Sequence, residues 1–311
     1  MKREASTLFA FLAMLGFLAV AAPAFFQSGN LRDVVLGNVS VLIAAIGMTM
    51  VILVRQIDVS IGAQFAVCAI AAGLLAKTGL PMALVALGAI AVGALLGALN
   101  GFLVARMQLP AIVVSLAAMA VWRDAIRWLT GGAWIEGLPS GFQWFGLGQG
   151  TAEGLIVGLS LAILAVLAWA LRNLAAGRAI YATGSDAEAA RLAGIDGRAV
   201  TFFVFVGMGA LNGLSALLDS VRFSEIQTNG GTGFELKVIA AVVVGGTSIQ
   251  GGRGSLAGTL LGVAILGIIG PALTFLGVNA FWEKAIQGAI ILGTVGFDAA
   301  RTRAGGYALA R

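Results

Sequence analysis

The chain has 311 residues, of which 59% are hydrophobic and only 11% are charged, and its formal net charge is +5. Soluble domains carry about 25% charged residues and have no means of hiding this much apolar surface, so the composition excludes a soluble enzyme, a nucleic-acid-binding protein and a disordered scaffold. The chain has no histidine and only one cysteine, Cys68, which excludes His-ligated metal sites, Ser-His-Asp catalysis and an internal disulfide.

Ten apolar segments predict membrane helices, because a helix needs about 20 apolar residues to cross the hydrocarbon core of a bilayer. We therefore expect an all-α fold, a polytopic membrane helix bundle of about 10 transmembrane helices in a single transmembrane domain over residues 1–311. The expected spans are residues 6–26, 34–54, 58–76, 81–105, 111–129, 154–171, 199–219, 235–248, 255–276 and 280–298.

Two of these segments have more than one interpretation. The first follows Lys2 and Arg3 and ends in small residues at 19–24, so a cleaved signal peptide is the alternative to the uncleaved span that we expect. The eighth, at 235–248, is short and is either a tilted crossing or a partly re-entrant segment.

Lysine and arginine set the orientation, since the cytoplasmic loops of membrane proteins carry an excess of both. If the N-terminus is cytoplasmic, loop 172–198, which has four arginines, lies inside. Loop 130–153, which has neither arginine nor lysine, then lies outside. Ten spans then bring the C-terminus to the cytoplasm as well. The other basic residues on the inner side are Lys2, Arg3, Arg55, Arg106, Arg253, Arg301, Arg303 and Arg311.

Two kinds of repetition occur along the chain. Spans 2–5 and 7–10 form blocks of four that run in opposite directions, so we expect an inverted pseudo-repeat of the kind found in many transporters. Glycines also recur every four residues, which lets helix backbones approach closely. We expect tight packing at these rows, with a sliding surface between helices as the alternative. The rows are Gly93, Gly97 and Gly101, then Gly209 and Gly213, then Gly254, Gly258 and Gly262.

The inner loop contains signals for a short helix at 186–193. Ser185 and Glu188 have the S-x-x-E spacing of a capping box, and Gly194 suits the position that ends a helix. A two-turn helix is unstable alone in water, so something must hold it. It either lies on its own membrane domain or enters a groove of a partner protein.

The segment 182–195 resembles the coupling-helix region of permease subunits from ABC importers, in the ribose and simple-sugar family. The run RQIDVSIG at 55–62, the run GTGFELKVIAAVVVGGTS at 231–248 and the glycines of 251–262 resemble further blocks of that family. Within it, residues 142–149 and 282–288 are closest in style to rhamnose-type permeases. Autoinducer-2 permeases and other simple-sugar permeases, of the ribose or xylose type, are the alternatives.

The resemblance implies a transport subunit that is not an enzyme and binds no cofactor or metal. ATP and magnesium would be bound by a partner ATPase, which agrees with the absence of a G-x-x-x-x-G-K-[ST] motif from this chain. A second permease copy or a paralogue would complete the pore in the bacterial inner membrane, among its lipids, and a periplasmic sugar-binding protein would dock outside. The residues implied in coupling to the ATPase are Gly184, Ser185, Glu188, Ala189, Ala190, Arg191, Leu192 and Gly194.

A translocation path needs polar groups within the bundle, where charges are costly unless they are paired or hydrated. An ion-coupled secondary transporter would also use such polar groups, but it is a remote alternative. The charged candidates fall near the ends of the spans, and a secondary transporter has no role for the short inner helix. The candidates are Asp58, Asn100, Arg123, Asp124, Asn212, Asp219 and Glu235, with Lys237 close by.

Overall fold

The computed structural model describes residues 2–279, 281–293 and 296, and these residues confirm an all-helical fold. The only strand-like contact among them is a single antiparallel bridge between Ile135 and Ile226. The helices are α1 (Lys2–Ala21), η1 (Pro23–Phe26), α2 (Ser28–Leu53), α3 (Ile61–Lys77), α4 (Met82–Gly101), the π-helical turn η2 (Phe102–Arg106), α5 (Ala111–Thr130), η3 (Gln143–Gly146), α6 (Gln149–Asn173), α7 (Ala175–Ser185), α8 (Ala187–Leu192), α9 (Gly197–Ser220), α10 (Phe234–Val244) and α11 (Leu256–Phe275), and residues 282–293 are helical as well.

Each expected span coincides with a helix, the last one over the described residues 282–293 of the expected 280–298, but the helices differ in their ability to cross a bilayer. Among the described residues, 6 helices are long and apolar enough to do so: α1, α2, α4 with η2, α6, α9 and α11. The apolar helix α3 has 17 residues. Helix α10 has 11 residues, which at about 1.5 Å per residue reaches roughly half of the ~30 Å hydrocarbon core. The eighth segment is therefore a half-helix and not a full crossing.

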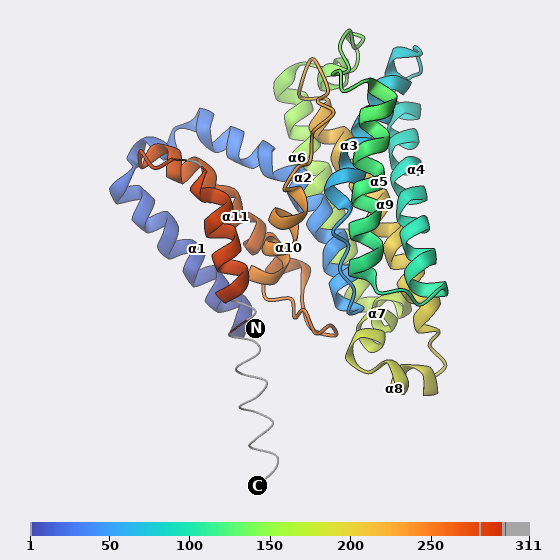
Figure 1. Cartoon of the computed structure of the whole chain (residues 1–311). Coiled ribbons are helices and arrows are strands. Elements are labelled where there is room, and N and C mark those ends of the chain that lie inside the picture. The colour runs from blue at the N-terminus through green and yellow to red at the C-terminus, as the bar shows by residue number, and fades with distance from the viewer. Residues whose placement is uncertain (1, 280, 294–295, 297–311) are drawn as a thin grey trace.

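Helix α2 is the centre of the bundle, since 83% of its most apolar window is buried. Figure 1 shows α1 and α11 on one side of it and α3, α4, α5 and α9 on the other, with α7 and α8 at one end. The first turn of α1 lies at this same end. Ser255, at the start of α11, donates a hydrogen bond to Glu4 of α1. The loop just before Ser255 contacts the end of α7, where the Ser185 hydroxyl donates to the Gly252 carbonyl. Arg301, Arg303 and Arg311 lie outside the described residues.

The glycine rows are packing surfaces. A Cβ atom on Gly93 would overlap the carbonyl oxygen of Gly209, and one on Gly97 would overlap that of Phe205, so α4 and α9 meet backbone to backbone. In the same way, a Cβ on Gly262 of α11 would overlap the Ala241 carbonyl of α10. Only glycine allows these approaches, which confirms the expected tight packing.

Two loops differ from their expected bounds. The loop expected at 130–153 spans residues 131–148, because α6 begins at Gln149, five residues earlier than the hydrophobic run suggested. It folds over the segment that follows α9, where Trp144 N donates to Val221 O at 2.7 Å. The loop expected at 172–198 holds two helices instead of one, since α7 precedes α8.

Candidate functional site

The carboxylate of Asp186 caps the short helix α8. Its Oδ1 accepts hydrogen bonds from the backbone N–H groups of Glu188 and Ala189, both at 3.0 Å. The expected capping box from Ser185 is wrong, because Ser185 is the last helical residue of α7, whereas Asp186 has the extended backbone that an N-cap requires. Gly194 ends the turn with a φ of 80°, as expected.

Helix α8 projects away from the bundle. Ala190 is its only buried residue, and Leu192 is 75% exposed. Glu188 and Arg191 are exposed and form an ion pair with a shortest distance of 2.6 Å. Glu188 and Arg191 form an exposed charged surface, and Ala189 and Leu192 form an exposed apolar one. The helix therefore does not lie flat on its own membrane domain.

Arg55 supports the corner between α7 and α8 from behind. Its Nε donates to the Gly184 carbonyl at 2.6 Å and its Nη2 donates to the Ser185 carbonyl at 2.5 Å. Gly184 is buried against the end of α2, where a Cβ atom would overlap the Leu53 carbonyl. The Gly252 N–H donates to that same carbonyl at 2.9 Å. Three segments distant in sequence thus converge behind α8.

Asp58 and Asn100 are brought together in a closed polar cluster. Asp58 is 1% exposed, and its Oδ1 accepts from the backbone N–H of Ser60 at 2.9 Å and from the Ser60 hydroxyl at 2.5 Å. Its Oδ2 accepts from Gln64 Nε2 at 3.1 Å and from Asn100 Nδ2 at 3.3 Å. The cluster fixes the start of α3 to α4, and it faces none of the cavities described below.

Three more candidates lie where the starts of α3 and α10 meet. Asn212 Nδ2 donates to the Ile61 carbonyl at 2.9 Å, and Arg123 Nη1 donates to the Gly230 carbonyl at 2.6 Å. Glu235 Oε2 is buried and has no hydrogen-bond partner within the described part of the chain. The hydrogen bonds of Asn212 and Arg123 hold the irregular segments that precede both helices.

Asp124 lies apart from this interior. It faces outward from α5, with 76% of its side chain exposed, and pairs with Arg127 at 3.6 Å. The neighbouring Arg123 points inward, since adjacent residues on a helix face different directions. Asp124 therefore lies on the outer surface of this chain and not in its interior.

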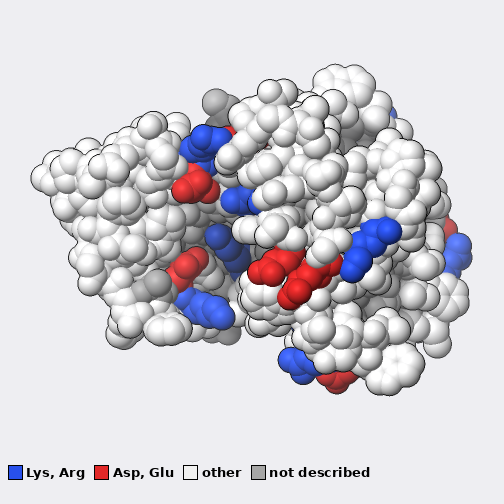
Figure 2. All heavy atoms as spheres, turned by 90° about the horizontal axis from the view of Figure 1, so that it is seen from above, with Lys and Arg blue, Asp and Glu red and all other residues white. Residues whose placement is uncertain are grey.

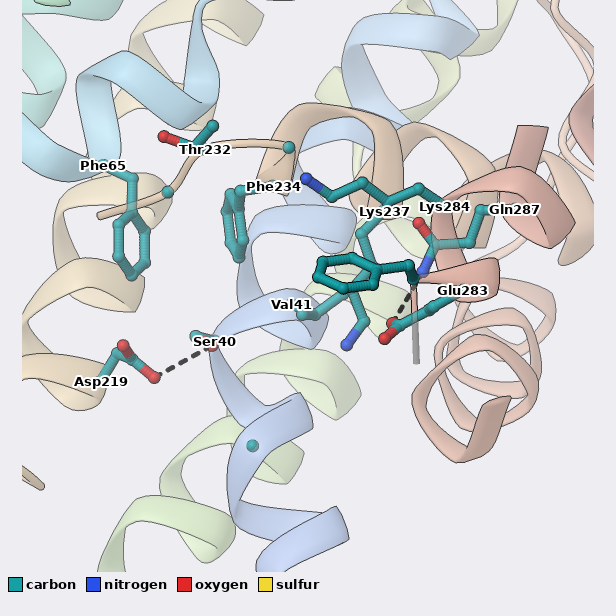
Figure 3. Close-up of a pocket in the computed structure, with 14 residues that line it drawn as sticks. Ser40, Val41, Phe65, Asp219, Thr232, Phe234, Lys237, Glu283, Lys284 and Gln287 are labelled. Atoms are coloured by element: carbon teal, nitrogen blue, oxygen red, sulfur yellow. Dashed lines mark hydrogen bonds between the residues drawn. The ribbon is translucent and has the colours of Figure 1, made fainter. Parts of the chain in front are cut away.

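A polar cavity of about 450 Å³ opens between α2, the start of α10 and the helix at 282–293. Figure 2, viewed from the end opposite α8, shows charged side chains gathered along a hollow between two parts of the molecule. Figure 3 shows side chains of Asp219, Lys237, Glu283 and Lys284 around this space. Its lining consists of Gly37, Ser40, Val41, Phe65, Asp219, Gly231, Thr232, Gly233, Phe234, Lys237, Phe281, Glu283, Lys284 and Gln287.

Of the residues predicted to line a path, Asp219 borders this cavity, together with Lys237. Its Oδ1 accepts from Arg222 at 3.3 Å and from Ser40 at 3.5 Å. Glu283 and Lys284 were not among the candidates, although charged residues inside an apolar segment were a signal that could have found them. The sequence indicates that they fall in the last span, but it does not show that this span packs beside α10.

Comparisons with known proteins agree with the helical architecture and the motifs. Residues 31–295 match the family model described as "Branched-chain amino acid transport system / permease component". The chain belongs to this permease family. Two similar relatives are named autoinducer 2 import system permease protein LsrC. The one from Enterobacter sp. (strain 638) is 35% identical over 95% of this chain and 86% of the relative. The one from Salmonella typhi is 34% identical over 95% of this chain and 85% of the relative. No solved structure matches significantly.

These findings confirm the resemblance to ABC-importer permeases of the simple-sugar type. The permease is a multi-pass membrane transport subunit and not an enzyme, because members of its family have no ATPase site of their own.

Proposed function

We propose that the permease is the membrane-spanning subunit of an ABC importer that moves autoinducer 2, or a small sugar-like solute of similar size, into the cell. The names of its relatives support this solute class. Import proceeds by alternating access, and affinity for the solute comes from a periplasmic sugar-binding protein that docks on the 131–148 loop.

The single observation that carries the importer mechanism is the exposed helix α8 on a rigid support. A helix with one buried residue contributes little to the stability of its own domain, yet Arg55 fixes its base through two short hydrogen bonds. Such a projection suits a groove of a partner. We assign it to an ATPase that binds ATP and Mg²⁺ and transmits its closure through α8.

This assignment also sets the orientation. The α8 end is cytoplasmic, and the start of α1 lies at the same end, so the N-terminus is cytoplasmic in the inner membrane. The cavity then opens toward the periplasm. A second permease, either another copy of this chain or a paralogue, completes the assembly.

Uptake of labelled autoinducer 2 and of labelled L-rhamnose, in cells with and without the gene, tests the solute. Loss of autoinducer-2 uptake alone supports the proposal. Loss of rhamnose uptake alone would move the assignment to that sugar, which the motifs at 142–149 and 282–288 favour. Uptake that collapses with an ion gradient while ATP is maintained would support an ion-coupled carrier instead.

Charge reversal on α8 tests the coupling. Glu188→Lys and Arg191→Glu each break the exposed ion pair, and we expect the reconstituted complex to hydrolyse ATP without uptake. Arg106→Glu, an exposed reversal outside α8, is the matched control and should transport normally. Normal uptake by both α8 variants would reject the coupling role.

A further inference from the structure

The cavity beside α10 has balanced charge. Two carboxylates, from Asp219 and Glu283, and two ammonium groups, from Lys237 and Lys284, line it. A solute with a net charge of either sign would meet as many repelling as attracting groups. The lining therefore favours an uncharged solute, and its volume of about 450 Å³ lies in the range of ~300–1,000 Å³ typical of small-molecule sites.

Neither lysine of the cavity donates a hydrogen bond within the described part of the chain. Within residues 2–279, 281–293 and 296, neither Lys237 nor Lys284 makes a hydrogen bond or an ion pair, although Lys237 is partly buried in the membrane-spanning region. An ammonium group in such a place is costly unless acceptor oxygens surround it. The carboxylates of Glu283 and Asp219 act on Lys237 through their charge, but neither forms a hydrogen bond to it, so its N–H groups are free to donate to oxygen atoms that enter the cavity.

Asp219 offers the complementary group on the opposite wall. Ser40 and Arg222 both bond to its Oδ1, whereas its Oδ2 has no partner in the described chain. The cavity thus presents lysine N–H donors on one side and a free carboxylate oxygen on the other, and Figure 3 shows Lys237 and Asp219 on opposite sides of this space. Hydroxyl groups both accept and donate, so they satisfy both walls.

Two aromatic rings complete the lining. Phe65 of α3 and Phe234 of α10 have ring centroids 4.7 Å apart and form an apolar surface next to the charged groups. A ring-shaped polyol has C–H faces that pack on such rings and a rim of hydroxyls that reaches the charged side chains.

We propose that this cavity binds an uncharged, polyhydroxylated solute of five or six carbons, with Lys237 donating to its hydroxyl oxygens and Asp219 accepting from its hydroxyl protons. The site deepens the proposed function, on which it rests, because it places the transported solute at a defined position between α2 and α10.

The test measures binding directly, so that it does not depend on transport. Purified permease in nanodiscs is given tritiated autoinducer 2, L-rhamnose or D-ribose at millimolar concentration, with glutamate and choline as charged solutes of similar size. We expect saturable binding of at least one uncharged solute and none of the charged ones. Lys237→Met and Asp219→Asn should each weaken this binding by about tenfold or more, and Lys237→Arg, which keeps the donor, should retain most of it.

A steric pair separates loss of the site from loss of the fold. Gly37 lines the cavity and has open space where a Cβ would stand, so Gly37→Leu fills the cavity without straining α2. Gly207 of α9 also has open space but does not line the cavity, so Gly207→Leu is the control. Binding should be lost in the first and kept in the second, with both proteins monodisperse.

The outcomes distinguish this proposal from the proposed function. Equal binding by wild type, Lys237→Met and Gly37→Leu, or equal binding of charged and uncharged solutes, would overturn the cavity site even if uptake by the complete importer depends on α8. Cavity-dependent binding of a polyol without ATP-driven uptake would support the site and overturn the importer function.

Discussion

The two sides of α9 are built differently. On one side, glycines bring α9 and α4 into backbone contact along a seam with no room for a methyl group. At its far end, Asp219 and the segment that follows border a charged cavity beside α10. A packed interface resists small displacements, because each shift costs many contacts at once. The contrast predicts that α4 and α9 move as one body and that packing changes more easily beside the cavity than at the glycine seam.

The seam predicts the largest effect. Gly209→Val places a side chain against the Gly93 carbonyl, which belongs to the backbone and has no means of moving aside. Overpacking typically costs about 1–3 kcal/mol and occasionally more, and here it meets backbone, so we expect little monodisperse protein on size-exclusion chromatography in detergent. Gly207→Val on the same helix meets nothing within 4 Å and should behave as wild type. Equal yields of both variants would show that the seam is loose.

The Asp58 cluster predicts an intermediate effect. Asp58→Ala leaves the backbone N–H and the hydroxyl of Ser60 without their acceptor, whereas Gln64 and Asn100 keep the Ser60 hydroxyl oxygen. Each unsatisfied buried group costs about 1–3 kcal/mol. We expect a clear fall in the thermal unfolding midpoint. Asp124→Ala removes only an exposed pair, worth about 0–1 kcal/mol, and serves as the comparison. Equal midpoints would mean that the cluster does not fix α3 to α4.

The smallest effect concerns the α8 ion pair. The hydrogen-bonded guanidinium of Arg191 lowers the pKa of Glu188 below its ordinary value of 4.5. A lowered carboxylate pKa stabilises the folded helix above the unfolded pKa, and this contribution is lost as pH falls through the folded pKa. The pair therefore stays intact from neutral pH down to the ordinary glutamate range.

Nuclear magnetic resonance of carboxyl-labelled glutamate in the nanodisc-bound permease measures this pKa, with Glu188→Gln to assign the signal. Arg191→Met should move the Glu188 pKa back toward 4.5, while both side chains remain exposed and the unfolding midpoint stays unchanged. An unmoved pKa would show that the pair is absent in solution.

The helices and the glycine seam were predictable from the sequence, because hydrophobic length and four-residue spacing are local properties. The position of α8 was predicted, but its cap was not, since Ser185 and Asp186 are both good caps and the extent of α7 decides between them. The path candidates shared polarity and predicted depth. The structure separates them into the enclosed Asp58, the exposed Asp124 and the cavity-lining Asp219, a distinction that depends on tertiary neighbours.

Helix α10 has a consequence for how the protein is made. Its 11 residues are too few for it to be inserted alone as a spanning segment. Its exposed ends and the irregular segment before it are tolerated in the bilayer only when other helices already cover them. During synthesis, α10 must therefore wait for α11, which follows it through a short glycine-rich loop, and enter the membrane with it as a hairpin against α2. We therefore expect the last quarter of the chain, from α10 onward, to assemble only after α11 has been synthesised, so that the cavity forms late in biogenesis.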